Sequence, residues 1–157
     1  GEVGREGEET REVLERVFPN LHYLWVRRDD KLRQAISMWK AKQTKIYNSL
    51  QESELQGAAE PVFDFEEIRK QKQRFEQEDE SWRQFFAESG ITPIIVHYER
   101  FAENYESGVG GIVRELGIDV AGELAVKPLT YRKLSDATNE EWRTRYLEME
   151  AVAPSSS

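Results

Sequence analysis

The sequence predicts a helix-rich α/β fold with a short parallel sheet. Two segments rich in aromatic and β-branched residues, LHYLWV at 21–26 and ITPIIVHY at 91–98, have the composition of strands. Segments with helical spacing separate them, and this alternation is typical of α/β layering. The length of 157 residues suits one domain. We expect that domain over residues 10–150, between a flexible segment at 1–9 and a disordered tail at 151–157.

The first half of the domain is predicted as helix, strand, helix. Residues 10–18 carry apolar residues at helical spacing. The strand at 21–26 is almost continuously apolar, so we expect it to be buried on both faces. Asp29 or Asp30 caps the helix that follows. One face of that helix carries three apolar residues at spacings of four and three: Leu32, Ile36 and Trp39.

A long helix is predicted after a loop at residues 45–62. Asp64 opens it, with Glu67 three residues on as in a capping box, and Ser89-Gly90 ends it. Its apolar residues recur every seven positions: Ile68, Phe75 and Trp82. This stripe is either part of the core or a seam against another subunit.

Two further helices are predicted after the second strand. The first runs over residues 103–116 and stops at Gly117. Residues 117–137 have the composition of a loop. Thr138 and Glu141 then form a second capping box. The buried face of the last helix is expected to carry three residues: Trp142, Tyr146 and Met149.

The composition excludes several classes of function. The chain has 22 basic and 30 acidic residues, a net charge of −8, which argues against a general nucleic-acid-binding protein. It contains no cysteine, and His22 and His97 are its two histidines, so we expect no metal site. No apolar run approaches the about 20 residues of a membrane helix. Since no secretory signal is visible either, we expect a cytoplasmic protein without membrane insertion.

A basic cluster lies where the first strand leads into the next helix: Arg27, Arg28, Lys31 and Arg33. Helix N-termini and arginine side chains both bind anions, so the cluster is a candidate phosphate site. Ser37 shares a helix face with Arg33 and could reach the same ligand. In the alternative interpretation the cluster is solvated surface charge that balances Asp29 and Asp30, and both interpretations stay open at this point.

Four segments of the chain resemble the bacterial trehalose 2-sulfotransferase (Stf) family, in the order in which that family has them. They are YLWVRRDDKLRQAISMWKAKQT, DESWRQFFAESGITPIIVHYERFAEN, GIVRELGI and RKLSDATNEEWRTRY. The resemblance covers most of residues 10–147. It implies part of the P-loop-like, three-layer sulfotransferase fold, and the transfer of a sulfuryl group from 3′-phosphoadenosine 5′-phosphosulfate (PAPS) to a carbohydrate hydroxyl.

The resemblance also implies roles for particular residues. Arg28 and Ser37 match the arginine and serine that bind the 3′-phosphate of PAPS and of its product, adenosine 3′,5′-bisphosphate. Arg27 stands one position away and remains an alternative to Arg28. Arg132 and Lys133 match a later basic pair at the same phosphate.

Other implications concern the acceptor and the reacting groups. The resemblance implies a sugar or glycolipid acceptor of the trehalose type, and we expect a homodimer. Glu99 matches a carboxylate that we interpret as structural, because it would tie the end of the second strand to a neighbouring turn. No residue is assigned as general base. His97 and His22 are more simply explained as structural histidines. Trp39 and Tyr47 could form a stacking surface for the sugar or adenine, and the alternative for Trp39 is a place in the core.

The resemblance fails at the N-terminus. Sulfotransferases of this type begin with a strand and a Gly/Ser/Thr-rich loop around the 5′-phosphosulfate, and GEVGREGEETREVLERVF does not match it. We therefore expect a C-terminal portion of the family fold. The alternative function is that of a catalytically incomplete, sulfotransferase-like remnant that acts as a homo-oligomeric or nucleotide-binding module.

Overall fold

The computed structural model describes residues 2–18, 20–45, 47, 60–118 and 137–152, with side chains from Thr10 onward. The chain divides into two compact units. The first unit consists of Gly1–Asp29 and Gln77–Pro128, and the second of Asp30–Glu76 and Leu129–Ser157. Two compact units can belong to one domain, so the single domain expected over residues 10–150 stays a prediction.

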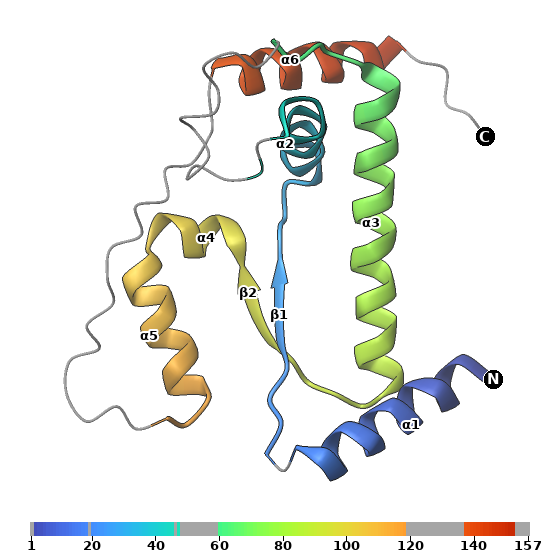
Figure 1. Ribbon diagram of the computed structural model, residues 1–157, viewed down its shortest axis with the longest axis vertical. Coiled ribbons are helices and arrows are strands. Elements are labelled where there is room, and N and C mark those ends of the chain that lie inside the picture. Colours follow the sequence, from blue (N-terminus) through green and yellow to red (C-terminus); the bar gives the residue numbers. More distant parts are fainter. Residues whose placement is uncertain (1, 19, 46, 48–59, 119–136, 153–157) are drawn as a thin grey trace. The chain divides into compact units, whose positions relative to one another are not determined.

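The elements follow the predicted alternation of helices and strands (Figure 1). The first unit contains two strands, three helices and the second half of a long helix that it shares with the other unit: α1 (Glu2–Val17), β1 (Leu24–Arg27), α3 (Phe65–Glu88), β2 (Ile94–His97), α4 (Tyr98–Glu103) and α5 (Tyr105–Glu115). The second unit contains the first half of α3 and two further helices: α2 (Lys31–Thr44) and α6 (Ala137–Val152).

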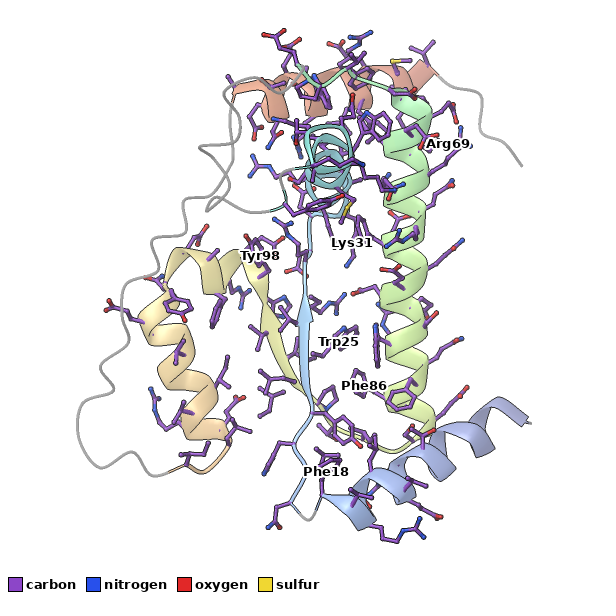
Figure 2. The ribbon with its side chains drawn as sticks, viewed as in Figure 1. Phe18, Trp25, Lys31, Arg69, Phe86 and Tyr98 are labelled. Atoms are coloured by element: carbon purple, nitrogen blue, oxygen red, sulfur yellow. The ribbon has the colours of Figure 1, made fainter. Side chains whose placement is uncertain are left out.

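The predicted helix-rich α/β class with a short parallel sheet is confirmed. β1 and β2 pair in parallel, with Leu24 opposite Ile94 and Arg27 opposite His97. Figure 2 shows Trp25 of β1 facing Phe86 of α3, and their ring centroids are 5.4 Å apart. The aromatic residues at the end of α3 therefore cover the sheet face that carries Trp25.

The expectation that the first strand is buried on both faces is wrong for the described residues. Trp25 is 9% exposed, but its neighbours Leu24 and Val26 are 42% and 60% exposed. Successive side chains of a strand point to opposite faces, so one face of β1 is covered and the other is open. An apolar run shows that a strand can be buried, and the layers around it decide whether it is.

The region after β2 differs from the prediction. Tyr98, expected as the last strand residue, begins α4, and the predicted helix over residues 103–116 divides at Asn104. The cause is local: Asn104 has φ −134° and ψ 62°, outside the helical region, so the helix cannot continue through it. Gly117 follows the helix at φ +65°, as predicted for its stop.

The outer helices are longer than predicted. α1 begins at Glu2, so residues 2–9 are helical, and the flexibility expected for the segment at 1–9 stays a prediction. Its glutamates are good helix formers and suit the positive end of the helix dipole, which offsets the cost of two glycines. α6 runs from Ala137 to Val152, so Thr138 lies inside the helix and is not its cap. Residues 151 and 152, which were expected in the disordered tail, are the last two residues of this helix.

The second unit is built around an apolar core. Ala35 and Ile36 of α2, Ile68 of α3 and Tyr146 of α6 are all 0% exposed. The predicted start of α3 is confirmed, since Asp64 accepts a hydrogen bond from the N–H of Glu67 at 3.0 Å. Met149 was expected on the buried face of α6, but it is 42% exposed.

Candidate functional site

The candidate site of the first unit lies at the carboxyl ends of β1 and β2. Because the strands are parallel, both chains leave the sheet at the same edge, with Arg27 paired to His97. Ligands of open α/β sheets commonly bind at this edge. The next residues on each side, Arg28 and Tyr98, therefore start their turns next to each other.

Arg27 is committed to contacts within the first unit. Its Nη2 lies 2.6 Å from Oδ2 of Asp79 on α3, and the two side chains are 22% and 10% exposed. The guanidinium also lies over the ring of Trp25, 4.7 Å from its centre. A partly buried ion pair of this kind holds the arginine in place. That Arg27 binds the phosphate stays a prediction.

Arg28 has a different environment from its neighbour. Its guanidinium carbon lies over the ring of Tyr98, 4.0 Å from the ring centre. The Nε atom of Arg28 is buried and has no hydrogen-bond partner among the residues that the structure describes. Within that part of the chain, no carboxylate is paired with this guanidinium, so its charge is not neutralised as that of Arg27 is.

Asp29 is attached to the end of β2 at two points. Its backbone N–H donates to Oε1 and Oε2 of Glu99, both at 3.2 Å. Its Oδ2 lies 2.8 Å from Nδ1 of His97. The predicted structural role of Glu99, which ties the strand end to a neighbouring turn, is confirmed. The contact of His97 agrees with its interpretation as a structural histidine. We call Asp29, His97 and Glu99 the strand-end clasp.

Asp29 and Asp30, which lie beside the basic cluster, both have hydrogen-bond partners within the protein. Asp29 belongs to the strand-end clasp, and Asp30 caps α2 by accepting a hydrogen bond from the N–H of Arg33 at 2.9 Å. Carboxylates at a candidate phosphate site would repel the ligand if they faced it freely. In the described structure the Asp29 carboxylate contacts His97, and the Asp30 carboxylate caps α2.

The other predicted site residues lie outside the first unit. Ser37 is half-buried on α2 of the second unit. Arg33 shares its face of the helix but forms an ion pair with Glu140 of α6, so the described structure does not leave this arginine for an anion. Arg132 and Lys133 lie outside the described residues. That Arg28, Ser37, Arg132 and Lys133 bind one phosphate stays a prediction.

Trp39 belongs to the second unit's core and not to a visible stacking surface. It packs against the buried cluster of that unit, and its Nε1 donates to the carbonyl oxygen of Val62 at 2.9 Å. The side chain of Gln43 also binds the backbone of Val62 in both directions, at 2.9 and 3.1 Å. The core interpretation of Trp39 is thus confirmed. Tyr47 is 56% exposed.

The first unit also contains an open hollow of about 390 Å³ beside β2. Its walls come from β2, α4 and α5, and they include Ile94, Val96, Phe101 and Ile112.

Among the described residues no cluster of histidine and carboxylate side chains could hold a metal ion. No described helix is long and apolar enough to cross a membrane.

Two residues of the site were missed by the sequence analysis. Tyr98 was assigned to the strand, and its contact with Arg28 depends on the strand register. Asp79 was not singled out in the long helix. It stands four residues after Phe75 and seven before Phe86, on the apolar stripe of α3, and an acid at such a position is a signal for a buried cation partner.

Comparison with known proteins identifies the family of this chain. The family model of the Stf0 sulphotransferases matches residues 3–149. A trehalose 2-sulfotransferase of Mycolicibacterium smegmatis is 31% identical over 127 residues, which cover 77% of this chain and 43% of that protein. The trehalose 2-sulfotransferase of Mycobacterium tuberculosis is 28% identical over 143 residues, 90% of this chain and 52% of that protein. The chain spans about half the length of these curated relatives. The chain belongs to the Stf0 sulphotransferase family.

Proposed function

We propose that the chain supplies the 3′-phosphate-binding part of a sulfotransferase that moves a sulfuryl group from PAPS to a carbohydrate hydroxyl, with trehalose or a similar sugar as acceptor. The observation that carries the proposal is the state of Arg28. It lies at the carboxyl edge of a parallel sheet, stacked on Tyr98 and without a carboxylate partner in the described structure. Membership of the Stf0 sulphotransferase family supports the 3′-phosphate of PAPS as the ligand of this guanidinium.

The geometry favours Arg28 over Arg27 as the phosphate-binding arginine. Arg27 is neutralised by Asp79 at 2.6 Å, and a phosphate could bind it only by breaking a partly buried ion pair. Arg28 keeps its planar fork of N–H donors, which matches the geometry of phosphate oxygens. Ser37, Arg132 and Lys133 complete the phosphate site in this proposal.

The cofactor supplies the reactive sulfuryl group. In the transfer, the acceptor hydroxyl oxygen forms a bond to sulfur, the bond from sulfur to the 5′-phosphate oxygen breaks, and a base takes the hydroxyl proton. The residues named here bind and orient the nucleotide at its 3′-phosphate. No bond of the 3′-phosphate forms or breaks in the transfer. We assign none of them as the base.

The first experiment measures nucleotide binding by calorimetry. Adenosine 3′,5′-bisphosphate should bind with micromolar affinity, and adenosine 5′-monophosphate, which lacks the 3′-phosphate, more weakly. Arg28→Ala should weaken binding of the bisphosphate by about 10- to 100-fold, since hydrogen bonds between charged groups contribute about 1.5–3 kcal/mol. Lys45→Ala, a charge removed at the far end of α2, is the control and should change affinity little. Equal losses in the two variants would contradict the assignment.

The acceptor proposal rests on the names of the two relatives at about 30% identity. It is tested by incubating the chain with PAPS and trehalose and detecting sulfated sugar by mass spectrometry. If the sulfuryl group were transferred to another sugar and not to trehalose, that sugar would replace trehalose as the proposed acceptor. Tight bisphosphate binding without transfer to any sugar would favour the nucleotide-binding module.

A second candidate function is that of a homo-oligomeric module, and the exposed apolar residues of the sheet favour it. Val26 is 60%, Ile95 47% and Leu24 42% exposed, although each belongs to a strand. Sedimentation equilibrium should then show a dimer that Val26→Lys dissociates. A monomer at all concentrations would exclude this candidate without affecting the nucleotide proposal.

A further inference from the structure

The parallel register brings a tyrosine under the arginine of the candidate phosphate site. Arg27 and His97 are paired across the strands, so Arg28 and Tyr98 are the first residues beyond the sheet on each side. Figure 2 shows Tyr98 where β2 leads into α4. The guanidinium carbon lies 4.0 Å from the ring centre, which is stacking distance.

Stacking orients the guanidinium without using its donors. An aromatic face against one side of a planar guanidinium leaves the terminal N–H groups at its edge for phosphate oxygens. A mobile arginine side chain loses conformational entropy when it binds a phosphate, because several of its rotatable bonds become fixed. A guanidinium already held on a ring loses less.

The strand-end clasp fixes the backbone on both sides of this stack. His97 and Glu99 flank Tyr98 in the sequence, and both bind Asp29, the residue that follows Arg28. The contacts are 2.8 Å from His97 Nδ1 to Asp29 Oδ2 and 3.2 Å from the N–H of Asp29 to the Glu99 carboxylate. Arg28 and Tyr98 are thus held opposite each other by their own neighbours.

We infer that Tyr98 is a positioning residue that holds the Arg28 guanidinium for the 3′-phosphate of the nucleotide. The inference rests on the proposed function, which assigns the phosphate to Arg28. It adds that the aromatic ring of Tyr98, and not its hydroxyl, sets the selectivity for nucleotides that carry a 3′-phosphate.

The test compares two ligands across a set of variants. For each protein, calorimetry gives the affinities for adenosine 3′,5′-bisphosphate and for adenosine 5′-monophosphate, and their ratio isolates the 3′-phosphate. Tyr98→Leu removes the ring and should lower the ratio about fivefold, the effect of an ordinary cation–π contact. Tyr98→Phe keeps the ring and should keep the ratio. Tyr105→Leu removes another aromatic ring of the same unit, one that contacts Phe101, and should also keep it.

The outcomes separate the inference from the proposal beneath it. An unchanged ratio in Tyr98→Leu, in a chain whose wild type prefers the bisphosphate, would overturn the role of Tyr98 alone. An equal loss in Tyr98→Phe would overturn it too, because the hydroxyl would then be responsible. A wild type that binds both nucleotides equally would overturn the phosphate assignment and the role of Tyr98 together.

A measurement on the wild type covers the case in which Tyr98→Leu does not fold. A guanidinium stacked on a ring places the Cδ protons of Arg28 in the ring's shielding region. Their NMR signals should be shifted upfield in the free protein and should stay shifted when the bisphosphate binds. Signals at ordinary arginine positions in both states would overturn the inference.

Discussion

The two units of the chain are stabilised in different ways. The second unit has residues from three helices that are completely buried, among them Ile36, Ile68 and Tyr146. The first unit has a sheet of two short strands, with Val26 60% exposed, and its strand ends are held by charged contacts such as Arg27 with Asp79. Burial of apolar area gives stability without direction, whereas ion pairs and hydrogen bonds fix particular atoms.

This difference suggests a division of roles. Substitutions in the second unit's core should lower the free energy of unfolding and affect the ligand only through folding. Substitutions at the strand ends should change nucleotide affinity more than their effect on stability would suggest. The following predictions test that division.

The largest effect is expected for Ile36→Ala in the core of the second unit. The side chain is 0% exposed, and removing it leaves a cavity among closely packed neighbours. The free energy of unfolding, measured in urea, should fall by about 2–5 kcal/mol. Met149→Ala, which truncates an exposed residue of α6, is the control and should cost much less. A similar loss in both variants would contradict the assigned core.

The next effect is expected for Asp79→Asn in the first unit. It leaves the positive charge of Arg27 partly buried without a carboxylate. Since the two side chains are 22% and 10% exposed, the loss should be about 2–3 kcal/mol, below the about 3–5 kcal/mol of a fully buried pair.

The neighbouring surface pair serves as the control for that prediction. Glu80 pairs with Arg83 on the same helix, and both side chains are 54% exposed. Glu80→Gln should therefore change the free energy of unfolding by only about 0–1 kcal/mol. If Asp79→Asn cost no more than Glu80→Gln, the structural role of Arg27 would be wrong, and Arg27 would return as a candidate for the phosphate.

The smallest effect depends on pH and belongs to Tyr146→Phe. The Tyr146 hydroxyl donates to Glu150 Oε1 at 3.2 Å, so its loss should cost about 1 kcal/mol at pH 8. Burial raises the pKa of Tyr146 from 10.0 to about 12. Between these values the unfolded tyrosine loses its proton while the folded one keeps it, so the wild type loses stability as the pH rises through this range.

The phenylalanine variant has no proton to lose. The advantage of the wild type in unfolding free energy should therefore fall from pH 10 to pH 12 and pass through zero, because each pKa unit corresponds to about 1.4 kcal/mol. Urea titrations across this range measure it. A constant difference would show that the hydroxyl titrates in the same way in both states.

The candidate site shows which contacts could be predicted from the sequence. Glu99 was expected to tie the strand end to a turn, and its bond to the N–H of Asp29 confirms this. The cap of α2 was narrowed to Asp29 or Asp30, and the structure selects Asp30. The cap joins residues three apart, where sequence spacing nearly fixes geometry. The bond between Asp29 and Glu99 joins residues 70 apart, and its prediction came from the family resemblance.

From the sequence alone we could predict the α/β class, the approximate positions of the two strands, a long helix where the structure has α3 (Phe65–Glu88), and the family resemblance that the family match confirms. The tertiary structure decided which of two adjacent arginines is neutralised. That choice depends on the register of β1 against β2 and on the face of α3 that meets the sheet, since a shift by one residue would exchange Arg27 and Arg28. Pairings between segments 50 or more residues apart are set by packing of the whole unit, and local propensity does not encode them.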